Sequence, residues 1–226
     1  MSKLQELKAK LEAIPDKQRR KDLVGKLERY GTLTVTAAET LLKCTEAQSH
    51  ARQVFTDEEF QKTTEQTRRA IGYASRLRTK LADNIEAVET SEAQFSALSE
   101  SAKLANTALK TRWSDLLTKR VEEFGKLVKV AKDANLPGNR ALEQTLLRLR
   151  TYTNNPPPSR EEAQRIENDL KSVVDSIQKL GLEGRGAEFL LAAIAGQGRA
   201  KDLSDPEVTE LVERYKLWDS LSVRLG

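Results

Sequence analysis

Residues 57–135 contain no proline and only two glycines, so nothing in this stretch obliges a helix to stop. Within it, small or apolar residues recur at every seventh position: Ala74, Leu81, Val88, Phe95, Ala102, Leu109 and Leu116. This period predicts a helix whose d positions face another helix. A single helix over the whole stretch would be about 120 Å long, at about 1.5 Å per residue.

The a positions that accompany this d row are mixed. Some are apolar, as at Ile71 and Trp113, but others are charged or polar, as at Arg78 and Glu92. A polar a row is unfavourable for a parallel two-stranded coiled coil and favours packing on neighbouring helices or antiparallel pairing. We predict one long helix here. The alternative is a hairpin whose turn lies in residues 89–103, where small and polar side chains dominate.

Composition supports a helical chain with much exposed surface. Charged residues make up 32 % of the sequence and hydrophobic residues 38 %, and the commonest types are strong helix formers. We therefore predict an all-α, elongated protein with a long central coiled-coil-like helix (or hairpin) and small helical modules at both ends. The four expected regions are a basic N-terminal helical region (1–55), the central helix (56–135), a helical hairpin (136–180) and a C-terminal helical interaction module (181–226).

Capping boxes mark the predicted helix starts, because a Ser or Thr and a Glu three residues later can satisfy each other's backbone N–H groups. The four pairs are Thr36/Glu39, Thr56/Glu59, Ser159/Glu162 and Ser204/Glu207. Before the first pair, Pro15 ends or kinks a helix with Leu4, Leu7, Leu11 and Ile14 on one face, and Asp16 restarts it. Gly31 then stops that helix, and residues 32–35 form a loop or a short strand.

Stop signals divide the second half of the chain. The segment NLPGN at 135–139 ends the central helix, and TNNPPPS at 153–159 is a stiff connector between helices 140–152 and 160–180. Two short helices, 186–195 and 205–221, close the chain. Tyr215 and Trp218 are expected three positions apart on one face of the last helix.

Residues 181–202 contain five glycines around one apolar octet, which suggests either a phosphate loop or a membrane segment. Neither GxxxxGK[ST] nor GxGxxG spacing is present, and the octet is under half a membrane span. We therefore interpret the glycines as helix ends and turns. The residues expected to contact a protein partner are Phe189, Leu190, Tyr215 and Trp218 in this module and Leu81, Val88 and Phe95 on the central helix.

No catalytic constellation is predicted. His50 is the only histidine and has no Cys or His companion for a metal site, and it is expected on the surface. Cys44, the only cysteine, is expected to be buried as a small packing residue. The carboxylates alternate with Lys and Arg along helices, which is typical of exposed ion pairs. We therefore expect no enzyme activity, no metal and no cofactor.

The formal net charge of +4 coincides with the excess in residues 1–29, which hold nine basic and five acidic residues. An alternative function therefore uses this region to bind nucleic acid. Its phosphate contacts would be Lys17, Arg19, Arg20, Lys21 and Lys26. Residues 34–55 also admit a helix-turn-helix, although the turn glycine is missing.

The function expected from these observations is that of a non-enzymatic structural or adaptor subunit. It uses its helical coil to bind protein partners, a second copy of itself among them, because the d row needs a second surface. The alternatives are a nucleic-acid-associated subunit and an accessory subunit of a separate ATPase or nuclease. No signal peptide or membrane span is recognised, so the expected location is the cytoplasm, with no membrane partner.

Overall fold

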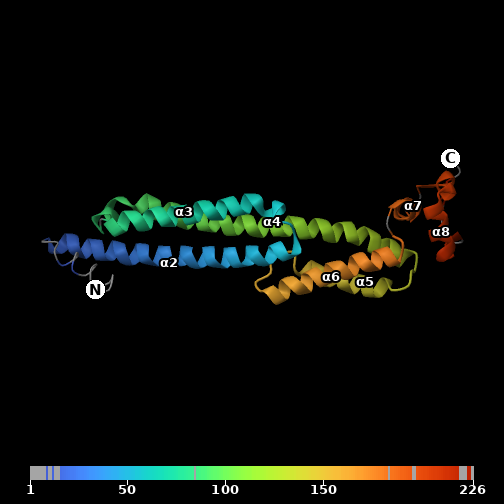
Figure 1. Cartoon of the computed structure of the whole chain (residues 1–226), viewed down its shortest axis with the longest axis horizontal. Helices are drawn as coiled ribbons and strands as arrows, with labels where there is room; N and C mark the ends of the chain where they lie inside the picture. The colour runs from blue at the N-terminus through green and yellow to red at the C-terminus, as the bar shows by residue number, and fades with distance from the viewer. Residues whose placement is uncertain are drawn as a thin grey trace. The chain divides into compact units, whose positions relative to one another are not determined.

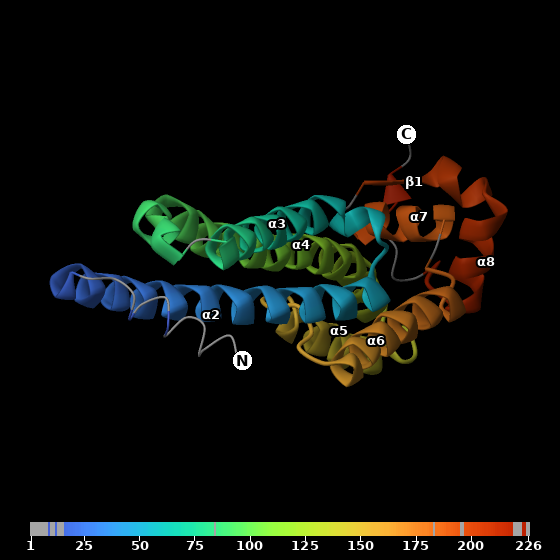
Figure 2. The ribbon, with the colours of Figure 1, turned by 60° about the vertical axis from the view of Figure 1, so that its left-hand side comes forward.

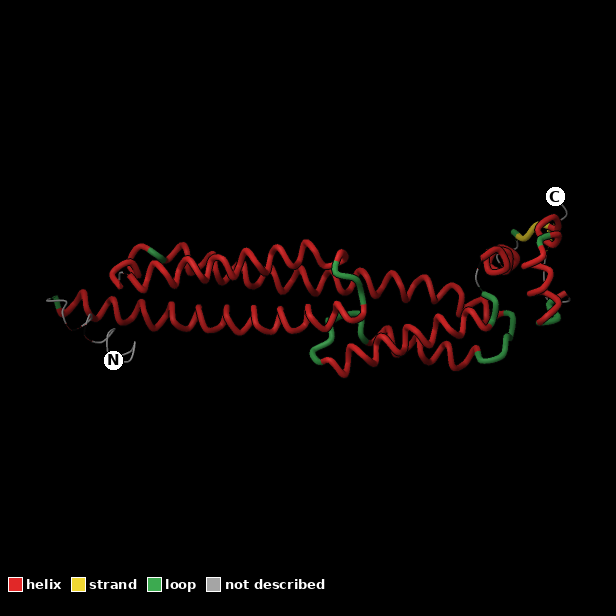
Figure 3. Tube along the Cα trace, in the orientation of Figure 1, coloured by secondary structure: helices red, strands yellow, loops and turns green. Residues whose placement is uncertain are grey.

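The computed structural model describes residues 9, 12, 16–83, 85–182, 184–194, 197–218 and 223–224. Almost all of these residues are helical, which confirms the all-α class (Figure 3). The chain divides into two compact units, residues 1–112 and 113–226, and α4 (Glu92–Asp133) contributes to both. The predicted face of Leu4, Leu7, Leu11 and Ile14 lies outside the described residues.

The first unit is a bundle of α2 (Lys17–Val54), α3 (Gln61–Asp83) and the first part of α4 (Figures 1 and 2). Asp16 caps α2 and accepts hydrogen bonds from the N–H groups of Gln18 and Arg19 at 2.8 and 3.1 Å, so the predicted restart at Asp16 is confirmed.

Helix α2 is longer than the sequence predicts. It continues through Gly31 and residues 32–35, and Thr36 lies inside it, so the predicted stop and the Thr36/Glu39 capping box are wrong. Residues 32–54 contain no turn, which also rules out the helix-turn-helix. The Thr hydroxyls donate to carbonyls one turn earlier, as from Thr34 to Tyr30 at 2.8 Å, so they stay compatible with helix.

The central stretch is a hairpin and not the single long helix that we preferred. α3 ends at Asp83, a 3₁₀ segment covers Ile85–Thr90, and α4 begins at Glu92. At one end of the hairpin, Leu77, Val88 and Phe95 share a core cluster. At the other end, Arg112 Nε donates to the carbonyl of Glu59 at 2.7 Å.

The second surface that the d row requires is therefore supplied by the chain itself. Tyr30 of α2 stacks on Phe95 of α4, with ring centroids 4.4 Å apart. Further along, Gln48 Nε2 donates to Thr64 Oγ1 of α3 at 2.7 Å. Because α2 packs along the α3–α4 hairpin, Val88 and Phe95 are buried without any second chain.

The second unit begins with Trp113, which is fully buried and donates from Nε1 to the carbonyl of Tyr152 at 2.8 Å. This unit contains the end of α4 together with α5 (Asn139–Thr151) and α6 (Arg160–Lys179), close to their predicted bounds. Arg148 of α5 and Asp169 of α6 form a two-bond ion pair at 2.9 and 3.2 Å.

The capping predictions for the second half are partly confirmed. Ser159 accepts a hydrogen bond from the N–H of Glu162, as the sequence predicts. At α8 (Pro206–Arg214), by contrast, Asp205 caps the helix in place of Ser204, which lies in the 3₁₀ segment Ala200–Ser204.

The C-terminal part contains α7 (Gly184–Ile194), α8 and a short parallel strand pair that the sequence did not predict. The strand Gly198–Arg199 (β1) pairs with Val223–Arg224 (β2). α8 ends at Arg214, so the predicted helix 205–221 is too long and Tyr215 and Trp218 do not share a helical face.

Candidate functional site

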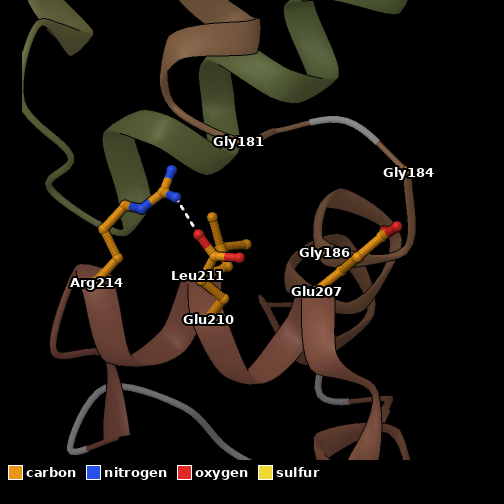
Figure 4. A pocket seen from close by; sticks show the side chains of 7 residues that line it. All are labelled: Gly181, Gly184, Gly186, Glu207, Glu210, Leu211 and Arg214. Atoms are coloured by element: carbon orange, nitrogen blue, oxygen red, sulfur yellow. Dashed lines mark hydrogen bonds and ion pairs between the residues drawn. The ribbon is translucent and has the colours of Figure 1, made fainter.

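The glycine-rich stretch folds the start of α7 against α8 (Figure 4). Gly181 and Gly184 both adopt a positive φ, which favours glycine. The carboxylate of Glu207 accepts a hydrogen bond from the N–H of Arg185 at 3.1 Å, and a Cβ on Gly184 would stand 2.8 Å from the same carboxylate. An anion at this helix start would therefore meet a negative charge, which supports the interpretation of these glycines as turn residues.

The cleft beside these glycines has a volume of about 410 Å³. Glu207, Glu210, Leu211 and Arg214 of α8 form one wall, and Arg214 is paired with Glu210 (Figure 4). Arg214, the one cation among the described residues that line the cleft, is therefore paired with a carboxylate one helical turn away. The described residues that line the cleft do not bring a nucleophile together with a base.

The single cysteine and the single histidine lie in α2. Cys44 is buried, as predicted, with Sγ 3.8 Å from Thr67 Oγ1, and burial raises the pKa of its thiol. His50 is half-buried. Among the described residues, no three His, Cys, Asp or Glu side chains lie close enough together to hold a metal ion.

Four of the residues predicted to contact partners are buried inside the chain. Val88 and Phe95 lie in the core of the first unit, and Phe189 and Leu190 lie in the core of the second. Leu81 is half-buried against the first of these cores. Their burial is explained by packing within one chain, and a role for them in binding a partner stays a prediction.

The aromatic residues after α8 are the more accessible part of the predicted interaction module. Tyr215 is half-buried, whereas the side chain of Trp218 is 50 % exposed. Because the helix ends between Val212 and Leu217, both of which are buried, the chain turns Trp218 outward. Among the residues predicted to contact a partner, Trp218 therefore exposes the largest aromatic side chain to solvent.

The basic residues at the start of α2 lie on the surface, and some of them have partners within the chain. Lys17, Lys21 and Lys26 are exposed. Arg19 Nε lies 3.4 Å from Glu89 Oε1, so part of this basic charge pairs with the turn between α3 and α4. Arg20 donates to the carbonyl of Glu12 at 3.1 Å.

A line of apolar side chains on α2 was not recognised in the sequence. Val24, Val35 and Leu42 are separated by 11 and 7 residues, which places them within about 20° of one another around a helix. They are 37, 58 and 61 % exposed, whereas Leu23, Tyr30 and Leu41 on the inner face are buried. We call Val24, Val35 and Leu42 the apolar line; the signal for it is their separation by near-whole numbers of turns.

A row of basic residues on α3 was also missed. Lys62, Arg69, Arg76 and Lys80 are spaced by seven, seven and four residues, so they lie along one side of the helix and are all exposed. We call these four residues the basic row. Tyr73 lies on the same side, with Arg76 Cζ 4.7 Å from the centre of its ring. The signal was present in the sequence as RRAIGYASRLRTK.

Comparison with known proteins provides no relative from which a function could be transferred. No protein-family model, no curated protein and no solved structure matches the chain. None of the described helices is long and apolar enough to span a membrane. The functional argument therefore rests on the surfaces just described.

Proposed function

We propose that this chain is a non-enzymatic structural or adaptor subunit that binds protein partners, and that it pairs with a second copy of itself along the apolar line of α2. The proposal rests on the exposure of Val24, Val35 and Leu42 on one side of a single helix. Covering large apolar side chains is favourable by about 25 cal/mol per Å² of apolar surface removed from water. An aligned set of three suits a helical partner better than scattered single residues do.

The spacing of the apolar line suits an antiparallel pair. If residue 33 of each copy lies at the centre of the contact, Val24 of one copy faces Leu42 of the other. Val35 then faces Gly31, where no atom lies within 4 Å of the position that a Cβ would take. The line extends over 18 residues, or about 27 Å, which is five turns of helix.

Charge favours the same orientation. Lys17 and Lys21 lie beside one end of the apolar line, and Glu46 lies beside the other end. In an antiparallel pair, the lysines of one copy approach the glutamate of the other, whereas a parallel pair brings like charges together. The predicted use of Lys17 and Lys21 in nucleic-acid binding would compete with this contact.

The test is the mass of the full-length protein in sedimentation equilibrium between about 1 and 100 μM. We expect a concentration-dependent dimer for the wild type and a monomer for the Val35→Glu, Leu42→Glu double variant, because two carboxylates would lie in the contact. Leu147→Glu is the matched control, since Leu147 is 52 % exposed on α5 and belongs to the second unit. A monomeric wild type over this range, or a double variant that still dimerises, contradicts the proposal.

Disulfide formation tests the orientation. In a Cys44→Ala background, a mixture of Val24→Cys and Leu42→Cys proteins should cross-link to each other, because a disulfide requires Cα atoms within about 7 Å. Each protein alone should remain uncross-linked in an antiparallel pair. Cross-linking of Val24→Cys with itself would indicate a parallel pair and contradict the proposed orientation.

A further inference from the structure

We propose that the basic row of α3 is a binding site for the phosphate backbone of nucleic acid. This site goes beyond the proposed self-association, uses a different helix, and differs from the N-terminal residues predicted from sequence. The ligand is recognised by its repeated negative charge, so binding should not depend on base sequence.

α3 is one of two helices in the first unit that carry a large excess of positive charge. α3 contains six basic and two acidic residues, an excess of four. The formal net charge of the whole chain is also +4, and residues 113–226 hold 18 basic and 18 acidic residues. The second unit is therefore neutral, and the positive charge belongs to the first unit, in which α2 and α3 each carry an excess of four basic residues.

The basic row has the geometry of an extended contact. Lys62 and Lys80 are 18 residues apart, or about 27 Å along the helix. Ala70 and Leu77 on the inner side of α3 are buried against the bundle, so the row faces outward. Arg68 is also exposed and lies about a quarter turn around the helix from the row, whereas the exposed Arg78 lies on the opposite side of the helix.

These cations lack anionic partners within the described part of the chain. None of the six basic residues of α3 forms an ion pair with a described residue, whereas Arg19, Arg29 and Arg52 of α2 all do. Like charges at neighbouring positions on a helix repel one another, as at Arg76 and Lys80. A bound polyanion would remove this repulsion without first breaking an intramolecular ion pair.

Tyr73 restrains one of the cations. Its ring lies under the guanidinium of Arg76, an arrangement that is electrostatically favourable and that reduces the freedom of the arginine side chain. Arg76 therefore loses less conformational entropy when it binds a phosphate.

Nucleic acid fits this surface better than a lipid bilayer does. A helix that lies in a membrane interface inserts its apolar face, and the apolar face of α3 packs inside the bundle. A rigid row of Lys and Arg at the surface of a folded bundle is instead suited to a linear array of phosphates.

The experiment measures binding of the full-length protein to a fluorescent 24-base-pair DNA of two unrelated sequences and to a single-stranded RNA of the same length. For four phosphate contacts on duplex DNA, we expect affinity to fall by about 150-fold between 50 and 200 mM salt, and to be equal for the two sequences. Failure to bind either nucleic acid at 50 mM salt overturns the proposal. So does an affinity that is insensitive to salt.

Charge-matched variants locate the site. The Arg69→Gln, Arg76→Gln, Lys80→Gln variant should lose most of its affinity, and its salt slope should fall by nearly three. The control Lys119→Gln, Lys126→Gln, Lys129→Gln removes the same charge from exposed positions of α4 in the second unit and should retain the wild-type slope. Circular dichroism checks that both variants keep their helix content.

A third variant separates this site from the predicted N-terminal one. Lys17→Gln, Lys21→Gln, Lys26→Gln should bind nucleic acid nearly as the wild type does. If this variant loses the binding and the α3 variant keeps it, the proposed site is wrong. Phosphatidylserine vesicles that bind the protein in place of nucleic acid, with the same dependence on α3, also overturn it. Sedimentation of the α3 variant reports self-association separately, so the two proposals fail independently.

Discussion

At the scale of single residues, three helix ends share one arrangement. Asn135, Gly181 and Lys216 follow α4, α6 and α8 with φ values of 50, 65 and 53°. In each case the next residue is a leucine whose N–H donates to a carbonyl five residues earlier, as from Leu217 to Val212 at 2.9 Å. This is the Schellman arrangement, and the leucine is buried each time.

Two of these three ends were predictable from sequence. Asn and Gly tolerate the left-handed conformation, so Asn135 and Gly181 are recognisable stops. Lysine is a good helix former and gives no such signal, which explains why the last helix was predicted to continue to residue 221. Burial of Leu217 stabilises the conformation at Lys216 that the local sequence disfavours.

Lys216→Gly should therefore stabilise the second unit. Glycine adopts the positive φ without the steric cost of a Cβ, and we expect a gain of about 1 kcal/mol in the free energy of unfolding. Gly181→Ala should lose a similar amount, because its Cβ would also stand 3.3 Å from Leu211 Cδ1. Urea unfolding followed by tryptophan fluorescence measures both. A destabilised Lys216→Gly protein would contradict the assignment.

At the scale of elements, packing decides where helices end. α2 continues through Gly25 and Gly31, although each glycine lowers the stability of a helix by about 1 kcal/mol relative to alanine. Burial of Tyr30, Ala37 and Leu41 of the same helix compensates for this loss. Conversely, the single helix predicted over 57–135 is replaced by two helices, one that ends at Asp83 and one that begins at Glu92, although no glycine or proline lies between them. The sequence SEAQ at 91–94 has the capping pattern Ser-x-x-Gln, which was the one local signal for the start of α4.

The contact between Tyr30 and Phe95 should be an energetic link between α2 and α4. In a double-mutant cycle of Tyr30→Leu and Phe95→Leu, we expect a coupling of about 0.5–1.5 kcal/mol, as for other stacked aromatic pairs. The measurement is the free energy of urea unfolding of the four proteins by circular dichroism. Additive effects of the two substitutions would mean that the rings contribute only through their separate burial.

At the scale of the whole molecule, the chain divides into two compact units, residues 1–112 and 113–226. Leu23, Tyr30, Leu77, Val88 and Phe95 form a core cluster of the first unit, and Trp113 packs in the second. Both tryptophans of the chain, Trp113 and Trp218, belong to the second unit. Tryptophan emission therefore reports the second unit alone, while circular dichroism reports both.

Phe95→Ala should separate the unfolding of the two units. Removing this buried ring costs about 3–5 kcal/mol in the first unit. We expect part of the helical signal to be lost at lower urea concentration, while the midpoint of the tryptophan transition stays at its wild-type value. If both probes shift together, α4 couples the units into one cooperative transition.

The sequence by itself determined the helical class, the helix–connector–helix order of residues 139–180, the cap at Ser159 and the inward position of Cys44. These features follow from local propensity and from the period of apolar residues, which act within a few turns of chain. Only the tertiary structure decided that the central stretch folds back as a hairpin, because that choice depends on α2 covering Val88 and Phe95. The tertiary structure also decided which apolar side chains stay exposed to solvent. Val24, Val35 and Leu42 of α2 are exposed because no part of the described chain packs over them.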